Sequence, residues 1–160
     1  MSIVIFSRAI RSGKTTELRQ WCATKKNVAG ILMPDLNGSR KILDIATQNV
    51  FDIACAEPQN TTQALINIGR FYFYEHAFEQ ANRILLSALQ AKPQWLVVDE
   101  VGKLELDNKG FYESLQQIIP YYQQNKAVGN LLLVVRDSLL EQVKQKFSIN
   151  ITENELLHKL

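Results

Sequence analysis

The sequence has little cysteine, proline or glycine. Its 160 residues include 2 Cys, 4 Pro and 7 Gly, which excludes a disulfide framework and a collagen-like or low-complexity chain. Cys22 and Cys55 have no CxxC spacing and no histidine cluster beside them, so the sequence predicts neither a disulfide nor a zinc site. We expect two buried free thiols.

An excess of charge of one sign and long apolar runs are also missing. The chain has 18 Lys and Arg against 16 Asp and Glu, a net charge of +2, which is too balanced to indicate a nucleic-acid or membrane surface. The run at residues 131–135 is far shorter than the ~18 apolar residues of a membrane span, and the run at residues 3–6 is too short for a signal peptide. We therefore expect a cytoplasmic protein with no nucleic-acid or membrane partner. The sequence leaves the oligomeric state open, and we favour a monomer.

The apolar residues predict alternating strands and helices within one domain over residues 1–160. Short continuous apolar runs, typical of strands covered on both faces, lie at residues 3–6, 28–33, 95–98 and 131–135. Helical spacings lie between these runs, in segments 18–22, 78–89, 111–122 and 139–143. This alternation predicts an α/β fold, a mainly parallel sheet between two layers of helices.

Residues 34–74 interrupt that alternation. The pairs Asn37-Gly38 and Gln48-Asn49 are typical of tight turns, and β-like runs at residues 42–47 and 50–56 lie beside them. The aromatic run 71–74 also favours a strand. We expect an antiparallel insertion here. At the other end of the chain, Thr152 and Glu155 match a capping box, which predicts a short closing helix.

The segment between the first strand and the first helix has the context of a phosphate-binding loop. In such a loop, backbone N–H groups surround phosphate oxygens, a lysine reaches the outer phosphates and a hydroxyl holds Mg²⁺. The sequence Gly13-Lys14-Thr15 fits these roles in order, but the consensus GxxxxGK[ST] has glycine where this chain has Arg8. The expected phosphate-binding residues are Arg8, Ala9, Ile10, Arg11, Ser12, Gly13, Lys14, Thr15 and Thr16.

Two adjacent carboxylates follow the apolar run at residues 95–98. Open α/β sheets bind their ligands at strand ends of this kind. Asp99 is expected to hold Mg²⁺ with Thr15, and Glu100 to orient and deprotonate the attacking water. The alternative is that Asp99 and Glu100 are solvated acids without a catalytic role. Because they follow Gly13-Lys14-Thr15 in the order that a P-loop enzyme requires, we favour the catalytic role. Lys14 and Glu100 are the expected catalytic residues.

The residues that follow carry a resemblance to a known family. The segment Asp-Glu-Val-Gly-Lys-Leu-Glu-Leu at 99–106 closely resembles the signature Asp-Glu-Ile-Gly-Lys-Met-Glu-Leu of a small nucleoside-triphosphatase family, which includes thermostable enzymes and the cancer-related nucleoside-triphosphatase. The segments 30–35 and 68–72 resemble its Gly-Phe-x-Thr-x-Glu and Val-Gly-Lys-Tyr segments, and residues 78–89 are similar to the helix before its Walker B strand.

This resemblance implies a P-loop domain of the RecA/AAA-like kind that hydrolyses nucleoside triphosphates to diphosphates with Mg²⁺ and weak base selectivity. It also implies a role for the signature loop, in which Lys103 either contacts phosphate or pairs with a neighbouring acid. The chain departs from the family at four positions. Arg8 and Arg11 stand where the family typically has glycines, and Met33 and Asp35 stand where it has threonine and glutamate.

Two other functions stay open from the sequence. The same loop and Asp99 would serve a nucleotide or small-molecule kinase, although Glu100 and the absence of an Arg-rich lid run favour water as the acceptor. The arginines of the loop also suit a regulatory module that binds nucleotide without turnover. Arg8 either helps to bind phosphate or blocks the pocket, and we expect ion pairs or a bound anion to hold the empty loop. Arg136 is either a phosphate-sensing residue or part of a surface ion pair.

Overall fold

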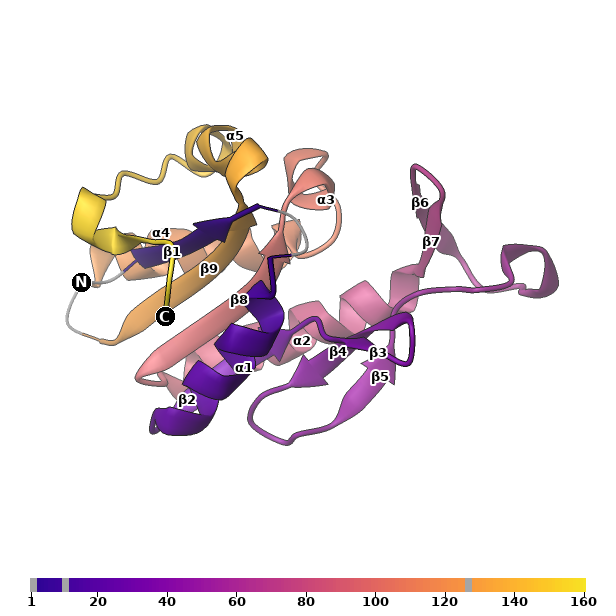
Figure 1. The fold of residues 1–160 in the computed structure, drawn as a ribbon, viewed down its shortest axis with the longest axis horizontal. Helices are drawn as coiled ribbons and strands as arrows, with labels where there is room; N and C mark the ends of the chain where they lie inside the picture. The colour runs from indigo at the N-terminus through magenta and orange to yellow at the C-terminus, as the bar shows by residue number, and fades with distance from the viewer. Residues whose placement is uncertain (1–2, 10–11, 126–127) are drawn as a thin grey trace.

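The computed structural model describes residues 3–9, 12–125 and 128–160. Its main sheet has eight strands in the order β10-β1-β9-β8-β2-β4-β3, with β5 paired to β4, and a separate hairpin pairs β6 with β7 (Figure 1). The strands are β1 Ile3–Arg8, β2 Val28–Leu32, β3 Asp35–Leu36, β4 Ser39–Asp44, β5 Val50–Asp52, β6 Leu65–Ile68, β7 Phe71–Tyr74, β8 Trp95–Val101, β9 Asn130–Arg136 and β10 Leu156–Leu157. The α-helices are α1 Lys14–Thr24, α2 Glu75–Ala91, α3 Lys103–Leu106, α4 Tyr112–Gln124 and α5 Leu140–Lys146.

The predicted apolar runs form the parallel part of the sheet. Strand β9 lies between β1 and β8, and β2 pairs with the far edge of β8, all in parallel register. Carboxyl ends of parallel strands meet at one edge of a sheet, so the segments that follow β1 and β8 approach each other there. Strand β8 is longer than predicted, because it continues through Asp99 and Glu100 to Val101.

Helices cover both faces of the sheet, which confirms the predicted three-layer α/β fold. Alternate residues of a strand point to opposite faces. Accordingly, Val4 and Phe6 of β1 pack with Leu18 of α1 on one face, whereas Ile3 and Ile5 pack in the core formed with α2 and α4. Within the described part of the chain, we find no helix long and apolar enough to cross a membrane.

The expected antiparallel insertion is present. Strands β3, β4 and β5 pair antiparallel and extend the sheet beyond β2, to which β4 is also antiparallel. Hairpin β6–β7 and the segment before it project from the body of the protein (Figure 1). The turn at Asn37-Gly38 has positive φ values of 55° and 75°, as the two central residues of a type I′ hairpin turn require. Strand β4 begins and ends three residues earlier than the predicted run, at Ser39–Asp44, and β5 is shorter than predicted, because it ends at Asp52.

The predicted closing helix is present only as one short turn. Thr152 and Glu155 do form the capping contact, in which the Thr152 N–H donates to the Glu155 carboxylate at 2.8 Å, but it caps a single 3₁₀ turn, Glu153–Glu155. The next two residues form β10, which pairs in parallel with Ile5 and Phe6. The free edge of β1 therefore takes the backbone of Leu156 and Leu157 into the sheet, and the helix does not continue.

Candidate active site

The predicted phosphate loop joins the end of β1 to the start of α1. Arg8 ends the strand and Lys14 begins the helix. Gly13 lies before Lys14 with φ 78°, a left-handed conformation that favours glycine. Among the other predicted residues, the side chains of Ala9, Ser12 and Thr16 are exposed, and Ile10 and Arg11 lie outside the described residues.

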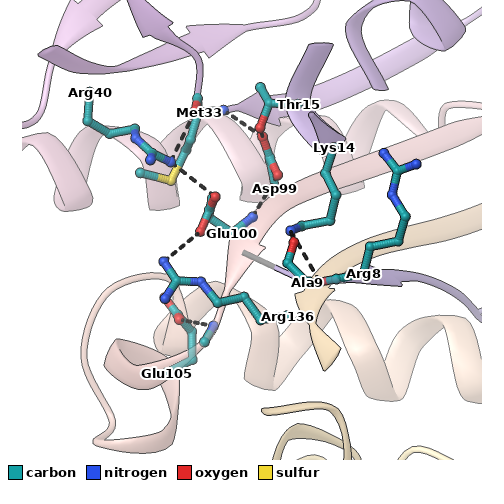
Figure 2. Close-up of polar contacts among 11 residues, drawn as sticks. Arg8, Ala9, Lys14, Thr15, Met33, Arg40, Asp99, Glu100, Glu105 and Arg136 are labelled. Carbon is teal, nitrogen blue, oxygen red and sulfur yellow. Dashed lines mark hydrogen bonds and ion pairs between the residues drawn. The ribbon is translucent and has the colours of Figure 1, made fainter. Parts of the chain in front are cut away.

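Lys14 folds its side chain back into this loop. The residue is buried, and its Nζ donates to the carbonyl oxygens of Ala9 at 2.7 Å and Arg8 at 3.3 Å (Figure 2). Burial lowers the pKa of the Lys14 ammonium, while the charges of Glu100 and Asp99 act to raise it. The ammonium therefore lies within the electrostatic reach of both carboxylates of β8.

Arg8 holds the loop through its own contacts. Its Nη2 lies 2.8 Å from Glu17 Oε2, in the first turn of α1, and donates to the carbonyl oxygen of Ser12 at 3.1 Å. Its guanidinium also lies over the Phe6 ring, 5.1 Å from the centroid. The expectation that ion pairs hold the loop is thus confirmed for Arg8.

Thr15 and Asp99, the predicted metal ligands, are in direct contact. The Thr15 hydroxyl donates to Asp99 Oδ2 at 2.9 Å, and the Met33 N–H donates to the same oxygen at 3.0 Å. Asp99 is fully buried, and burial together with the charge of Glu100 raises its pKa to about 6, against the lowering effect of the hydrogen bonds from Met33 and Thr15. A hydroxyl beside a buried carboxylate is a hard oxygen donor set of the kind that Mg²⁺ prefers, so these residues fit the metal.

Glu100 lies at an irregularity of β8 and is held by two arginines. The pairing with β9 shifts between Val98 and Val101, and Glu100 has φ 59°, which is uncommon for a residue other than glycine. Its Oε1 lies 3.0 Å from Arg40 Nη1 and its Oε2 lies 3.7 Å from Arg136 Nη2. Figure 2 shows the two guanidinium groups approaching the carboxylate from different sides.

Sequence reasoning missed Arg40. This residue lies in β4, opposite Asp35 of β3, and its Nη1 also approaches the Met33 carbonyl oxygen at 3.4 Å. Nothing local distinguishes it from other charged residues of a surface hairpin. Only the pairing of β4 with β2, and of β2 with β8, places it beside Glu100, sixty positions further along the chain.

The signature loop after β8 is held from inside by Glu105. This buried side chain accepts the N–H of Gly102 at 2.8 Å and the N–H of Phe111 at 2.9 Å. Burial raises the pKa of Glu105 to about 7, although both hydrogen bonds act to lower it. Lys103, in contrast, is exposed at the start of α3 and takes part in none of the ion pairs seen among the described residues.

The fold and site together define a P-loop α/β protein. Its marks are the loop from β1 to α1, into which Lys14 points, and the carboxylate pair at the end of β8. The family model described as NTPase matches residues 4–157. The chain therefore belongs to this NTPase family. Comparison with curated proteins gave no match.

Solved structures agree with this fold. The crystal structure of THEP1 from the hyperthermophile Aquifex aeolicus is similar with a TM-score of 0.71 and 17% identity, over 99% of this chain and 89% of that chain. The solution structure of a human cancer-related nucleoside triphosphatase is similar with a TM-score of 0.62 and 18% identity, over 96% of this chain and 90% of that chain. At these identities the likeness establishes the fold.

Proposed function

We propose that the protein hydrolyses nucleoside 5′-triphosphates to the diphosphate and inorganic phosphate, with weak base selectivity. One observation carries the proposal: the Thr15 hydroxyl, at the start of α1, lies 2.9 Å from Asp99 of β8, next to Glu100. This contact joins the phosphate loop to the carboxylate pair from a distant part of the chain. Membership of the NTPase family supports the same reaction.

Lys14 is proposed to bind the outer phosphates. In the structure its ammonium has carbonyl oxygens as partners, and phosphate oxygens are stronger acceptors because they carry charge. The N–H groups at the start of α1 and the helix dipole favour an anion at the same place. Phosphate binding would therefore replace the carbonyl contacts of Lys14 with charged ones.

Thr15 and Asp99 are proposed to hold Mg²⁺. When bound, the ion would neutralise phosphate charge and orient the triphosphate for in-line attack. Asp99 is buried, so a nearby cation would stabilise its ionised form. Thr15 donates its hydroxyl hydrogen to Asp99 in the structure, which leaves the oxygen lone pairs available for a metal.

Glu100 is proposed to act on the attacking water. The water oxygen forms a bond to the γ-phosphorus, the bond from that phosphorus to the β–γ bridging oxygen breaks, and the water proton passes to the Glu100 carboxylate. The diphosphate leaves with the bridging oxygen. Four further properties stay predictions from the sequence: a single domain, a monomeric state, a cytoplasmic location and the lack of a nucleic-acid partner.

Phosphate release from ATP, GTP, CTP and UTP, with and without Mg²⁺, tests the proposal. We expect Mg²⁺-dependent release from all four at similar rates. Release only in the presence of an acceptor molecule would indicate a kinase. Binding of nucleotide without release would indicate a regulatory module, and binding of none of the four would refute the assignment of the loop.

A further inference from the structure

Two arginines lie against the Glu100 carboxylate, one beside each oxygen. Arg40 donates a hydrogen bond to Oε1 at 3.0 Å, whereas Arg136 forms an ion pair with Oε2 at 3.7 Å, which is too long for a hydrogen bond. The Oε2 oxygen therefore keeps its lone pairs, but a guanidinium group lies beside it. A water that is to give its proton to Oε2 competes with Arg136 for this space.

The two contacts are not equivalent. Arg40 Nη1 lies 3.0 Å from Glu100 and has a second acceptor, the Met33 carbonyl oxygen at 3.4 Å. Met33 in turn donates its N–H to Asp99, which ties Arg40 to the metal side of the site. Arg136 Nη2 lies 3.7 Å from Glu100, and this carboxylate is its one ionic partner among the described residues. Arg136 is therefore the more weakly held of the two.

The two arginines also differ in where they lie in the sheet. Arg136 ends β9, in register with Arg8 of β1, so it lies between the strand that enters the phosphate loop and the strand that carries Glu100. The charge of Arg136 acts on Lys14, and the charge of Arg40 acts on Asp99. Arg136 thus lies within electrostatic reach of Lys14 in the phosphate loop, and Arg40 within that of Asp99.

We propose that Arg136 leaves Glu100 to bind the γ-phosphate, whereas Arg40 stays on Glu100 as a positioning residue. This inference rests on the proposed hydrolysis. A γ-phosphate carries more negative charge than one carboxylate oxygen and accepts the two-pronged donors of arginine, and the Arg136 side chain is partly exposed (34%). Its departure frees Oε2 for the water proton, while Arg40 fixes Oε1.

The division of roles predicts different defects for the two arginines. Arg136→Ala should weaken binding of a β,γ-imido triphosphate analogue by about ten- to a hundredfold, the loss expected for a charged hydrogen bond. Its affinity for ADP should change less than about threefold, because ADP has no γ-phosphate. Arg40→Ala should leave both affinities within about threefold and lower kcat by about tenfold or more, since a misplaced base is costly. Arg40→Lys should recover part of kcat, because the charge beside Oε1 remains.

Calorimetric titrations and steady-state kinetics measure these effects, with Arg83→Ala as a matched control on an exposed arginine of α2. Circular dichroism establishes that each variant is folded, and Arg136→Gln replaces Arg136→Ala if the latter is not. Equal losses for ADP and the triphosphate analogue, or no loss, would overturn the role of Arg136. A change of KM at constant kcat in Arg40→Ala would overturn the role of Arg40.

Measurements on the wild-type protein distinguish a failure of this inference from a failure of the proposed function on which it rests. If wild-type protein hydrolyses triphosphates and both variants behave like Arg83→Ala, the inference fails and the proposed function stands. If wild-type protein binds the analogue but releases no phosphate, hydrolysis fails, and the inference fails with it, because it assigns Glu100 as the base for that reaction.

Discussion

Replacement of Glu105 by glutamine tests how the loop after β8 is held. The carboxylate accepts the N–H groups of Gly102 and Phe111, and the residue is only 1% exposed. Burial raises its pKa from 4.5 to about 7, so Glu105 changes its charge near neutral pH in the folded protein. Glutamine has nearly the same shape as the protonated acid and stays neutral at every pH.

The sign of the effect follows from proton linkage. The folded protein binds the Glu105 proton more tightly than the unfolded chain does. The contribution of this proton to the free energy of unfolding is therefore fully present below the ordinary pKa of 4.5, and it is lost as the pH rises through about 7. Between about pH 6 and about pH 8 the loss amounts to about 1 kcal/mol. The free energy of unfolding of the wild type, relative to Glu105→Gln, should fall by that amount over this interval.

Urea unfolding followed by circular dichroism at the two pH values measures the difference. Other titrating groups contribute to both proteins and cancel in the comparison. Glu79→Gln, on an exposed glutamate of α2, is the matched control and should show a difference that is constant with pH. A difference that is also constant for Glu105→Gln would refute the reasoning, because it would mean that Glu105 has the same pKa in the folded and unfolded states.

Four further predictions concern the site and the strands that support it. Lys14→Ala should weaken triphosphate binding by about tenfold or more in a calorimetric titration, because it removes a buried cation from the loop; unchanged affinity would place the phosphates elsewhere. Glu100→Gln should bind triphosphate but release phosphate about a hundredfold more slowly, since an amide accepts no proton; equal release would make Glu100 structural. Gly30→Ala should lower the free energy of unfolding by about 3 kcal/mol or more, because φ is +115° and the new Cβ would lie 2.0 Å from a carbonyl oxygen of β8. Gly38→Ala, where φ is +75° but nothing lies within 4 Å, is its control and should cost about 1 kcal/mol in the same thermal or urea unfolding assay. Glu105→Ala should cost about 2 to 4 kcal/mol by urea unfolding, as it leaves two buried N–H groups without an acceptor, and a loss below that of Glu105→Gln would contradict this.

The sequence by itself determined the parallel strands and the residues at their ends. A strand buried on both faces requires a continuous apolar run, and such runs mark β1, β2, β8 and β9 in the printed chain. The phosphate loop could be found because its parts are adjacent in sequence, from the end of β1 to Thr15. The carboxylates Asp99 and Glu100 were found for the same reason, since they follow directly on an apolar run.

Only the tertiary structure decided how these parts meet. The capping contact at Thr152 exists as predicted, but the free edge of β1 decided that Leu156 and Leu157 form a strand. The two partners of Glu100 come from β4 and β9, and no local pattern reports a pairing between strands so far apart in the chain. Local sequence fixes which backbone conformations are favourable, whereas the position of a side chain such as Arg40 depends on which strand edges remain to be paired.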